Sequence, residues 1–379
     1  MDVQGTVEPG WEAVADAFRG NFERGEEVGA SAYVTHRGRA VVDIWGGDAA
    51  EGGDPWAEDT IVNVYSTTKT MTAIAAMMCV DRGLIDPADP VAQHWPEFAA
   101  NGKEQVTIAH LLSHSAGLPG FDEPIAPEDL YDWDACAARL AAMSPWWEPG
   151  SASGYHAVTQ GNLVGEVVRR VSGKSLGTFV REEMAEPLGA DFHIGFGPEH
   201  DDRCGELVPP PNGLADRMDD VDLDSVAVRG LSSVPLTALE PRTRDWRAAE
   251  IPAAGGFGNA RSVGRIHSAI ACGGEVDGVR LMSADTVERI LEEQTDGTDL
   301  VLGTPIRFGL GFGLPSEMLP LPSPRSFFWG GWGGSLALID LDQQLTISYV
   351  MNKMAPELMG DNRALNVAMG AYGALMTQG

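Results

Sequence analysis

Positive charge is scarce in this chain, and lysine is scarcer still. The 379 residues hold 26 Lys and Arg against 55 Asp and Glu, which gives a formal net charge of −29 at pH 7. Because nucleic acids and anionic lipid headgroups are bound through a surplus of basic side chains, this balance argues against nucleic acid and against a membrane surface as partners. The lysines are so few that the place of each is informative: Lys69, Lys103, Lys174 and Lys353.

The chain also has few cysteines, no recognisable secretory leader and no long apolar run. The four cysteines are widely spaced and form no C-x-x-C pair, so neither a disulfide framework nor a Cys-based zinc site is predicted, and free thiols suit a reducing compartment. Residues 1–14 lack the basic and apolar regions of a signal peptide, and apolar stretches such as 73–80 are too short to cross a bilayer. We expect a cytoplasmic protein, although a secreted chain without its leader would look similar.

The strand patterns lie at the two ends of the chain. Apolar residues at helical spacing predict a helix over 10–25, and alternation around Arg37-Gly38 predicts a β-hairpin over 28–46. Toward the other end, predicted helices at 259–274 and 364–376 flank four predicted strands, at 307–314, 326–329, 335–340 and 345–351.

Residues 86–250 have a different texture. Pro- and Gly-rich loops separate helical patterns at 108–118, 130–143, 159–173 and 176–189, and the stretch 207–250, with Pro209-Pro210-Pro211 and an acidic run at 216–224, predicts a long irregular excursion. The simplest architecture is α+β. An antiparallel sheet domain is built from residues 1–85 and 251–379 and flanked by helices, and 86–250 form a mostly helical insertion within a single unit.

The segment 62–84 is almost wholly apolar and predicts a buried helix that ends at Gly83, with Ser66 and Lys69 at its start. Three residues apart, the two side chains share one face, where a desolvated lysine can remove the proton of a serine hydroxyl. A helix N-terminus also offers an amide N–H to a developing oxyanion. The structural alternative makes Ser66 an N-cap and Lys69 a surface residue of the first turn.

Two further segments carry candidate groups. Tyr155 lies in a loop just before a predicted helix, and the glycine-rich segment 327–340 is typical of a strand edge that another backbone approaches closely. Each segment also has a purely structural interpretation, as a packing aromatic in the first case and as a tight hairpin in the second.

Taken in order, Ser66-Thr67-Thr68-Lys69, Tyr155 and Trp329-Gly330-Gly331 resemble the S-x-x-K, Y-x-N and K-T-G motifs of serine β-lactamases and penicillin-binding proteins. The match is closest to the family VIII carboxylesterases, esterases with the class C β-lactamase fold, in which the third motif is often W-G-G. Segments 111–120, 155–163 and 330–340 are also typical of that broad group. The resemblance runs from about residue 10 to the C-terminus and implies an α/β sandwich of the β-lactamase/transpeptidase type.

The resemblance also implies a role for each matching residue. Ser66 would be the acylated nucleophile, Lys69 and Tyr155 would move protons as base and acid, and the backbone N–H groups of Ser66 and Trp332 would form the oxyanion hole. No cofactor and no metal is implied. The candidate pocket residues are Trp329, Gly330, Gly331, His156 and Phe121.

Two departures from the β-lactamase pattern favour neutral esters over anionic lactams. Ala157 replaces the Asn of Y-x-N, and Trp329 replaces the Lys of K-T-G, so the cation that faces a β-lactam carboxylate gives way to an apolar wall. The sequence therefore predicts a serine carboxylesterase that acts on small, short-chain carboxylic esters. The alternatives are β-lactamase, D-amino peptidase, linear-amide hydrolase or acyltransferase activity on this fold, or a catalytically silent binding protein. The oligomeric state is open.

Some matches to other chemistries are set aside. The segment 173–177 spells G-x-S-x-G, but the nucleophile elbow of α/β-hydrolases follows a strand and this segment follows a helical pattern, so Ser175 is predicted to be an N-cap. The eight histidines include no H-E-x-x-H, and His193 and His200 are too isolated in the sequence to predict zinc. His114 is interpreted as a structural hydrogen-bonding residue.

Overall fold

The computed structural model describes residues 2–210, 222–317, 319–356, 358 and 361–378. Pro211 and most of the acidic run at 216–224 lie outside the described residues, so the predicted excursion over 207–250 is followed only on either side of that gap.

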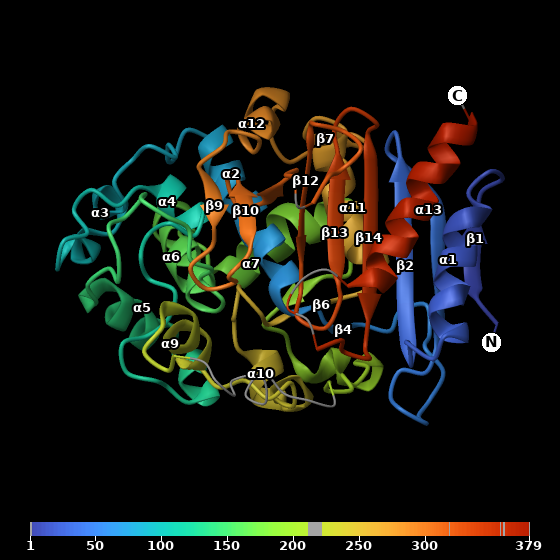
Figure 1. Cartoon of the computed structure of the whole chain (residues 1–379), viewed down its shortest axis with the longest axis horizontal. Coiled ribbons are helices and arrows are strands. Elements are labelled where there is room, and N and C mark those ends of the chain that lie inside the picture. Colours follow the sequence, from blue (N-terminus) through green and yellow to red (C-terminus); the bar gives the residue numbers. More distant parts are fainter. Residues whose placement is uncertain (1, 211–221, 318, 357, 359–360, 379) are drawn as a thin grey trace.

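In the described part of the chain, strands from both ends form one nine-stranded sheet with the order β1-β3-β2-β14-β13-β12-β11-β10-β9 (Figure 1). Every pairing within it is antiparallel, which confirms the predicted α+β architecture. The strands are β1 (Gln4–Val7), β2 (Gly29–His36), β3 (Arg39–Gly47), β9 (Thr295–Thr298), β10 (Pro305–Phe308), β11 (Gly313–Leu314), β12 (Ser326–Gly330), β13 (Leu336–Asp340) and β14 (Leu345–Met351).

Most of the helices fall between these two groups of strands. The α-helices are α1 (Glu12–Glu23), α2 (Thr68–Asp81), α3 (Val91–His94), α4 (Ile108–Leu112), α5 (Trp133–Ala142), α6 (Thr159–Ser172), α7 (Leu176–Val180), α8 (Glu186–Leu188), α9 (Val226–Ser232), α10 (Arg244–Ala248), α11 (Ala260–Ala271), α12 (Ala284–Arg289) and α13 (Asn362–Gln378). Shorter turns are the 3-10 helices η1 (Tyr65–Thr67), η2 (Pro96–Ala99), η3 (Pro127–Tyr131), η5 (Pro198–Arg203) and η7 (Glu240–Arg242), and the π-helical turn η4 (Arg181–Ala185).

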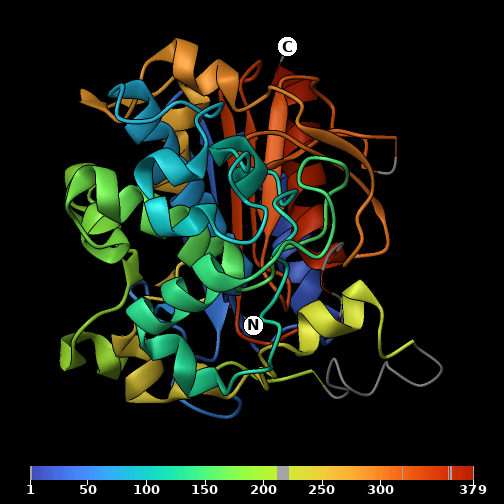
Figure 2. The ribbon, with the colours of Figure 1, turned by 90° about the vertical axis from the view of Figure 1, so that its left-hand side faces the viewer.

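Two small sheets complete the part of the fold that the structure describes. One joins β4 (Val62–Asn63), β6 (Gly256–Gly258) and β5 (His193–Ile194), and the other pairs β7 (Glu275–Val276) with β8 (Val279–Arg280). Figure 2 shows the helices from α3 to α6 in front of the large sheet.

Helices cover both faces of the large sheet. On one face lie α1 and α13, where Phe18 of α1 packs edge-on against Tyr349 of β14 (Figure 1). On the other face lies α11, and Gly264 permits its close approach to β2, because a Cβ there would be 2.4 Å from the Tyr33 ring. The N- and C-termini lie at the same end of the molecule.

The helix α2 runs through the core. Every residue of α2 from Thr68 to Val80 is buried, because α6, α7 and α12 pack against this helix. The prediction of a helix without a polar face is thus confirmed. Gly83 follows its last turn with a φ of +67°, as expected for a glycine just past the C-cap.

Two local predictions are wrong. The strand predicted over 307–314 is a hairpin of β10 and β11, because Gly311 adopts a φ of +89° and turns the chain so close to α2 that a Cβ would lie 2.3 Å from Ala73. The helix predicted over 108–118 ends at Leu112, since His114 has a φ of +60° and Gly117 a φ of +79°. The sequence patterns also did not predict β1 and β9.

Truncation of a side chain in α2 should cost much of the stability. Ile74 is fully buried, so Ile74→Ala leaves a cavity and should lower the free energy of unfolding by about 2–5 kcal/mol in urea titrations. Met376→Ala, at a side chain that is 85% exposed, is the control and should change it by less than about 0.5 kcal/mol. Equal losses in the two variants would contradict the central position of α2.

Candidate active site

Ser66 lies in η1, immediately before α2 and not within it. The preceding Tyr65 has a φ of +42°, a region that non-glycine residues rarely occupy, and this bends the chain just ahead of the serine. Thr68 holds the bend, because its hydroxyl donates to Tyr65 O at 2.5 Å and accepts from Gly256 N–H at 2.9 Å. Since Thr67 occupies the N-cap position of α2, the interpretation of Ser66 as an N-cap is wrong.

Lys69 is buried, with only 1% of its surface exposed, so the alternative of a surface lysine is wrong too. Its Nζ lies 3.0 Å from Ser66 Oγ, 2.6 Å from Ala157 O and 2.9 Å from Ala253 O. Burial lowers the pKa of Lys69 well below the ordinary lysine value. A neutral amine here donates its two N–H bonds to the two carbonyls and turns its lone pair toward the Ser66 hydroxyl, as a general base must.

Tyr155 brings a phenol to the same place. Lys69 Nζ lies 4.8 Å from the centroid of the Tyr155 ring. Burial raises the pKa of Tyr155, and a hydrogen bond with Ser66 opposes part of that rise. The phenol is therefore protonated at neutral pH, while the amine beside it is held toward its neutral form.

A buried carboxylate that no motif marks holds the Tyr155 loop. The backbone N–H of Tyr155 donates to Asp299 Oδ1 at 3.0 Å, and the same oxygen accepts from the N–H groups of Val301 and Leu302, both at 2.9 Å. Asp299 is fully buried. Asp299 therefore joins the backbone of Tyr155 to the loop that precedes β10 and holds the phenol in place.

His114 and His156 pack behind Tyr155. The His156 Nδ1–H donates to Gly154 O at 2.7 Å, its Nε2 accepts from Leu118 N–H at 3.1 Å, and its backbone N–H donates to His114 Nδ1 at 3.1 Å. Burial lowers the pKa of His156 to about 3 and that of His114 well below its usual range, so both rings are neutral. The structural interpretation of His114 is confirmed. His156 is fully buried, and its expected place in a pocket wall stays a prediction.

Trp329 belongs to a buried aromatic cluster beside the phenol. Its ring centroid lies 5.4 Å from that of Tyr155 and 5.3 Å from that of Phe308, and 3% of the residue is exposed. Contacts of this kind fix ring orientation as well as burying apolar area. A K-T-G motif would place an ammonium group at this position. This chain has the Trp329 ring there instead, and the ring packs against Tyr155.

The turn between β12 and β13 brings Gly331 against Ser66 and the Trp332 ring against Tyr65. A Cβ at Gly331 would lie 2.1 Å from Val64 O and 3.2 Å from Ser66 N, so the approach requires glycine. The Ser335 hydroxyl donates to Val64 O at 2.9 Å and joins the turn to the segment before the serine. Among the residues that the structure describes, the Trp332 N–H has no hydrogen-bond partner, which leaves it free to bind an anion.

Gly330 and Gly331 also border a cavity of about 230 Å³ on the α13 face of the large sheet. Its walls are mainly apolar side chains of β10 to β13, of the segment 319–321 and of α13, and the cluster of Ser66, Lys69 and Tyr155 does not line it. Phe121 is 3% exposed and lies in the main hydrophobic core, and its position in a substrate pocket stays a prediction.

Ser175, the serine of the G-x-S-x-G segment, is an N-cap as predicted. Helix α6 ends at Gly173, whose φ is +72°, and Ser175 caps α7 by accepting from Thr178 N–H at 3.3 Å. The Ser175 hydroxyl donates to Glu250 at 2.6 Å.

His193 and His200 are less isolated than the sequence suggested. Their ring centroids lie 4.3 Å apart, and Arg203 Nη2 donates both to His200 Nδ1 at 2.9 Å and to Asp191 Oδ1 at 2.7 Å. The guanidinium between these groups would repel a metal cation, so the contact is a structural cluster.

Comparison with known proteins agrees with this geometry. The Beta-lactamase family model matches residues 13–370. The chain belongs to the beta-lactamase family. It is 35% identical over 374 residues to the esterase/beta-lactamase LipL of Mycobacterium tuberculosis, covering 95% of this chain and 85% of that protein.

Two solved structures extend the comparison. A family VIII carboxylesterase is 42% identical with a TM-score of 0.93, covering 99% of this chain and 100% of that one. A penicillin-binding protein homologue from Caulobacter crescentus is 37% identical with a TM-score of 0.91 and the same coverage. The resemblance inferred from the three motifs is confirmed, and the family together with these relatives indicates a serine hydrolase. Among the described helices, none is both long and apolar enough to cross a membrane.

Labelling of Ser66 by a fluorophosphonate should depend on the protonation of Lys69. Burial lowers the Lys69 pKa and the amine is a base only when neutral, so the labelling rate should rise with pH and level off well below 10.5, the ordinary lysine value. Lys69→Arg should abolish labelling because the guanidinium stays charged. The rates are measured by gel fluorescence, and the label is located by peptide mass mapping.

The matched control is Lys174→Arg, at a partly exposed lysine paired with Glu183, which should label like the parent protein. A rate independent of pH, or a label on Ser175, would contradict the assignment.

Proposed function

We propose that the chain is a serine carboxylesterase that hydrolyses short-chain carboxylic esters through an acyl-enzyme on Ser66. One observation carries the proposal: a buried amine lies 3.0 Å from the Ser66 hydroxyl, with two backbone carbonyls as acceptors for its N–H bonds. That arrangement leaves the lysine lone pair for one task, the removal of the serine proton.

The opposed pKa shifts of Lys69 and Tyr155 support the following proton transfers. Ser66 Oγ attacks the ester carbonyl carbon while Lys69 takes the hydroxyl proton, and the oxyanion is bound by the backbone N–H groups of Ser66 and Trp332. Tyr155, whose pKa burial raises, donates its proton to the departing alcohol oxygen and regains one from Lys69. Water then attacks the acyl carbon and gives a proton to Lys69. The bond between the acyl carbon and Ser66 Oγ breaks as Lys69 returns that proton to the serine oxygen, and the carboxylic acid is released.

Three features support an ester as the substrate. Trp329 and Phe308 make the surroundings of Tyr155 apolar, and Ala157 contributes its carbonyl oxygen to Lys69 where a Y-x-N motif would supply a side-chain amide. Relatives of this chain are named esterase and carboxylesterase. The name of LipL also includes beta-lactamase, so hydrolysis of β-lactams is the second candidate.

We also propose a cytoplasmic location and an inserted domain at residues 86–250. Support for the location is that all four cysteines, Cys79, Cys136, Cys204 and Cys272, are unpaired, as is usual in a reducing compartment. Support for the insertion is that the large sheet takes its strands from the two flanking parts of the chain.

Ser66→Ala should abolish turnover of p-nitrophenyl butyrate, because it removes the acylated oxygen. The parent protein should hydrolyse this ester with a much larger kcat/KM than nitrocefin, measured side by side in a spectrophotometer. Retention of most esterase activity by the variant would contradict the proposal of an acyl-enzyme on Ser66. A large preference for nitrocefin would instead favour the β-lactamase candidate.

Gly331→Ala should lower kcat for p-nitrophenyl butyrate by roughly 10²–10³, the range seen when one oxyanion donor is lost. The reason is steric, since the new Cβ would meet Val64 O at 2.1 Å and push the turn away from Ser66. Gly330→Ala is the neighbouring control, where the nearest atom is Ser335 O at 2.9 Å, and its effect should be much smaller. Similar losses in both variants would contradict the role given to this turn.

A further inference from the structure

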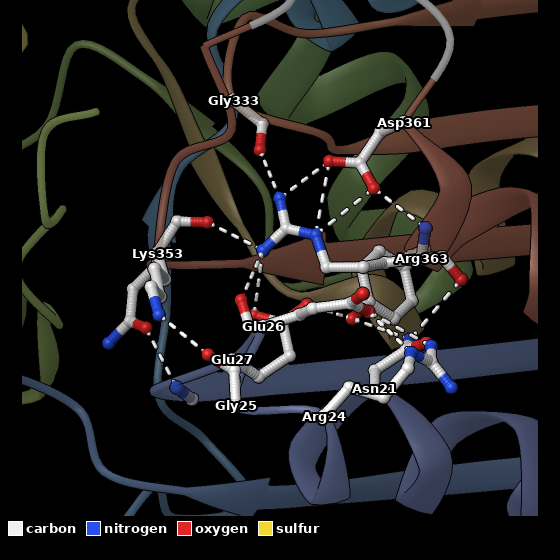
Figure 3. A network of polar contacts seen from close by, with 12 residues as sticks. Asn21, Arg24, Gly25, Glu26, Glu27, Gly333, Lys353, Asp361 and Arg363 are labelled. Carbon is white, nitrogen blue, oxygen red and sulfur yellow. Dashed lines mark hydrogen bonds and ion pairs between the residues drawn. The ribbon is translucent and has the colours of Figure 1, made fainter. Parts of the chain in front are cut away.

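Arg363, near the start of α13, is buried and lies at the centre of a polar network (Figure 3). Its Nη2 donates to Gly333 O at 2.6 Å and to Asp361 Oδ2 at 2.5 Å, and its Nε donates to Asp361 Oδ1 at 3.0 Å. Its Nη1 donates to Lys353 O at 2.7 Å and to Glu26 O at 3.1 Å. All five N–H bonds of the guanidinium therefore have an acceptor, a pattern that only arginine can supply.

The network surrounds the turn that carries the Trp332 N–H. Gly333 and Gly334 have φ values of +101° and +124°, and a Cβ at Gly334 would lie 2.2 Å from Asp361 Oδ2 and 2.7 Å from Arg363 Nη2. Gly333 O accepts a second bond, from Ala355 N–H at 2.9 Å. The turn is thus held at Gly333 and Gly334 by Arg363, Asp361 and the backbone of Ala355.

Two peptide groups link the guanidinium to the free N–H. The carbonyl of Gly333, which accepts from Arg363, belongs to the same peptide group as the N–H of Gly334. That N–H donates to Gly331 O at 3.0 Å, and the Gly331 carbonyl shares its peptide group with the N–H of Trp332. Since C=O and N–H point in opposite directions across a trans peptide, the two bonds form one series that runs from the guanidinium to the Trp332 N–H.

We propose that Arg363 is a positioning residue for the oxyanion hole, which it serves by orienting and polarising the Trp332 N–H through these two peptide groups. Hydrogen bonds in series strengthen one another, and the positive charge at the far end adds to the effect. The inference rests on the proposed function, because it gives the Trp332 N–H the task of binding the ester oxyanion.

The test combines Arg363→Lys with a pair of substrates. An ammonium group keeps the charge but cannot reach all these acceptors, so kcat for p-nitrophenyl butyrate should fall about tenfold, a fraction of the loss seen when an oxyanion donor is removed outright. KM should change little. The matching thionoester places sulfur, a weak acceptor, in the oxyanion hole, so the ratio of ester to thionoester turnover should fall by the same factor.

Two more variants separate positioning from stability. Tyr349→Phe removes the hydrogen bond to Glu27, which forms an ion pair with Arg363, without touching the bond to Gly333; it should lower the melting temperature and leave the substrate ratio unchanged. Asp361→Asn keeps Arg363 but weakens its clamp, and should lower the ratio by a smaller factor. All rates are taken at a temperature where circular dichroism shows each variant folded.

An unchanged ratio in both Arg363→Lys and Asp361→Asn would overturn the inference, and so would an equal drop in Tyr349→Phe. The two proposals fail differently. Turnover that survives Ser66→Ala would remove the proposed function, whereas turnover that needs Ser66 but ignores Arg363 would remove this inference alone.

Discussion

The burial of one amine, that of Lys69, is the constraint on which the rest of the structure depends. A lysine becomes a base near neutral pH only when water is kept away from its charged form. The chain meets this condition by giving α2 no polar face and by closing α6 and the segment before β6 around its first turn. The apolar character of α2 is therefore a requirement of the chemistry as much as of the fold.

Burial of a lysine is not by itself a mark of catalysis in this chain. Lys103 is also buried, and its Nζ donates to two backbone carbonyls, those of Ala100 and Met143, much as Lys69 does. The two lysines differ in the group that completes their surroundings. Lys69 has a serine hydroxyl at 3.0 Å, whereas Lys103 lies over the ring of Phe98. A hydroxyl beside the amine, more than the lowered pKa that burial gives to both lysines, is what distinguishes the candidate site.

Much of the candidate site could be predicted from the sequence, because its side chains belong to recognisable motifs. Ser66, Lys69 and Tyr155 are found from their residue types and order, and the alternating and helical patterns at the chain ends are enough to predict an antiparallel sheet with helices on it. The acceptors of the Lys69 amine could not be found in this way, since Ala157 and Ala253 take part through backbone oxygens that every residue has. Asp299 and Arg363 were missed for a related reason, because each acts on backbone groups far away in sequence.

The wrong local predictions share a cause. Hydrophobic periodicity over 307–314 and 108–118 is real, but left-handed residues at Gly311 and His114 break both segments. A pattern of apolar residues shows which side chains are buried and does not show where the backbone reverses. At both places the reversal brings the chain against the site region, Gly311 against α2 and His114 behind Tyr155.

The use of both chain ends to build one site has a consequence for how activity depends on folding. The proposed nucleophile and its proposed base come from η1 and α2, while the proposed oxyanion-binding turn lies between β12 and β13, more than 260 residues later. The clamp on that turn comes from Arg363 and Asp361 at the start of the last helix and from the backbone of Glu26 near the beginning of the chain. Since the guanidinium joins α13 to the segment after β14 and to the loop after α1, the proposed oxyanion turn would be fixed only when both ends of the chain have docked. A partly folded chain could form the Ser66–Lys69 contact locally within η1 and α2, but without that docking it would hold a nucleophile with no rigid site for the charge its attack creates.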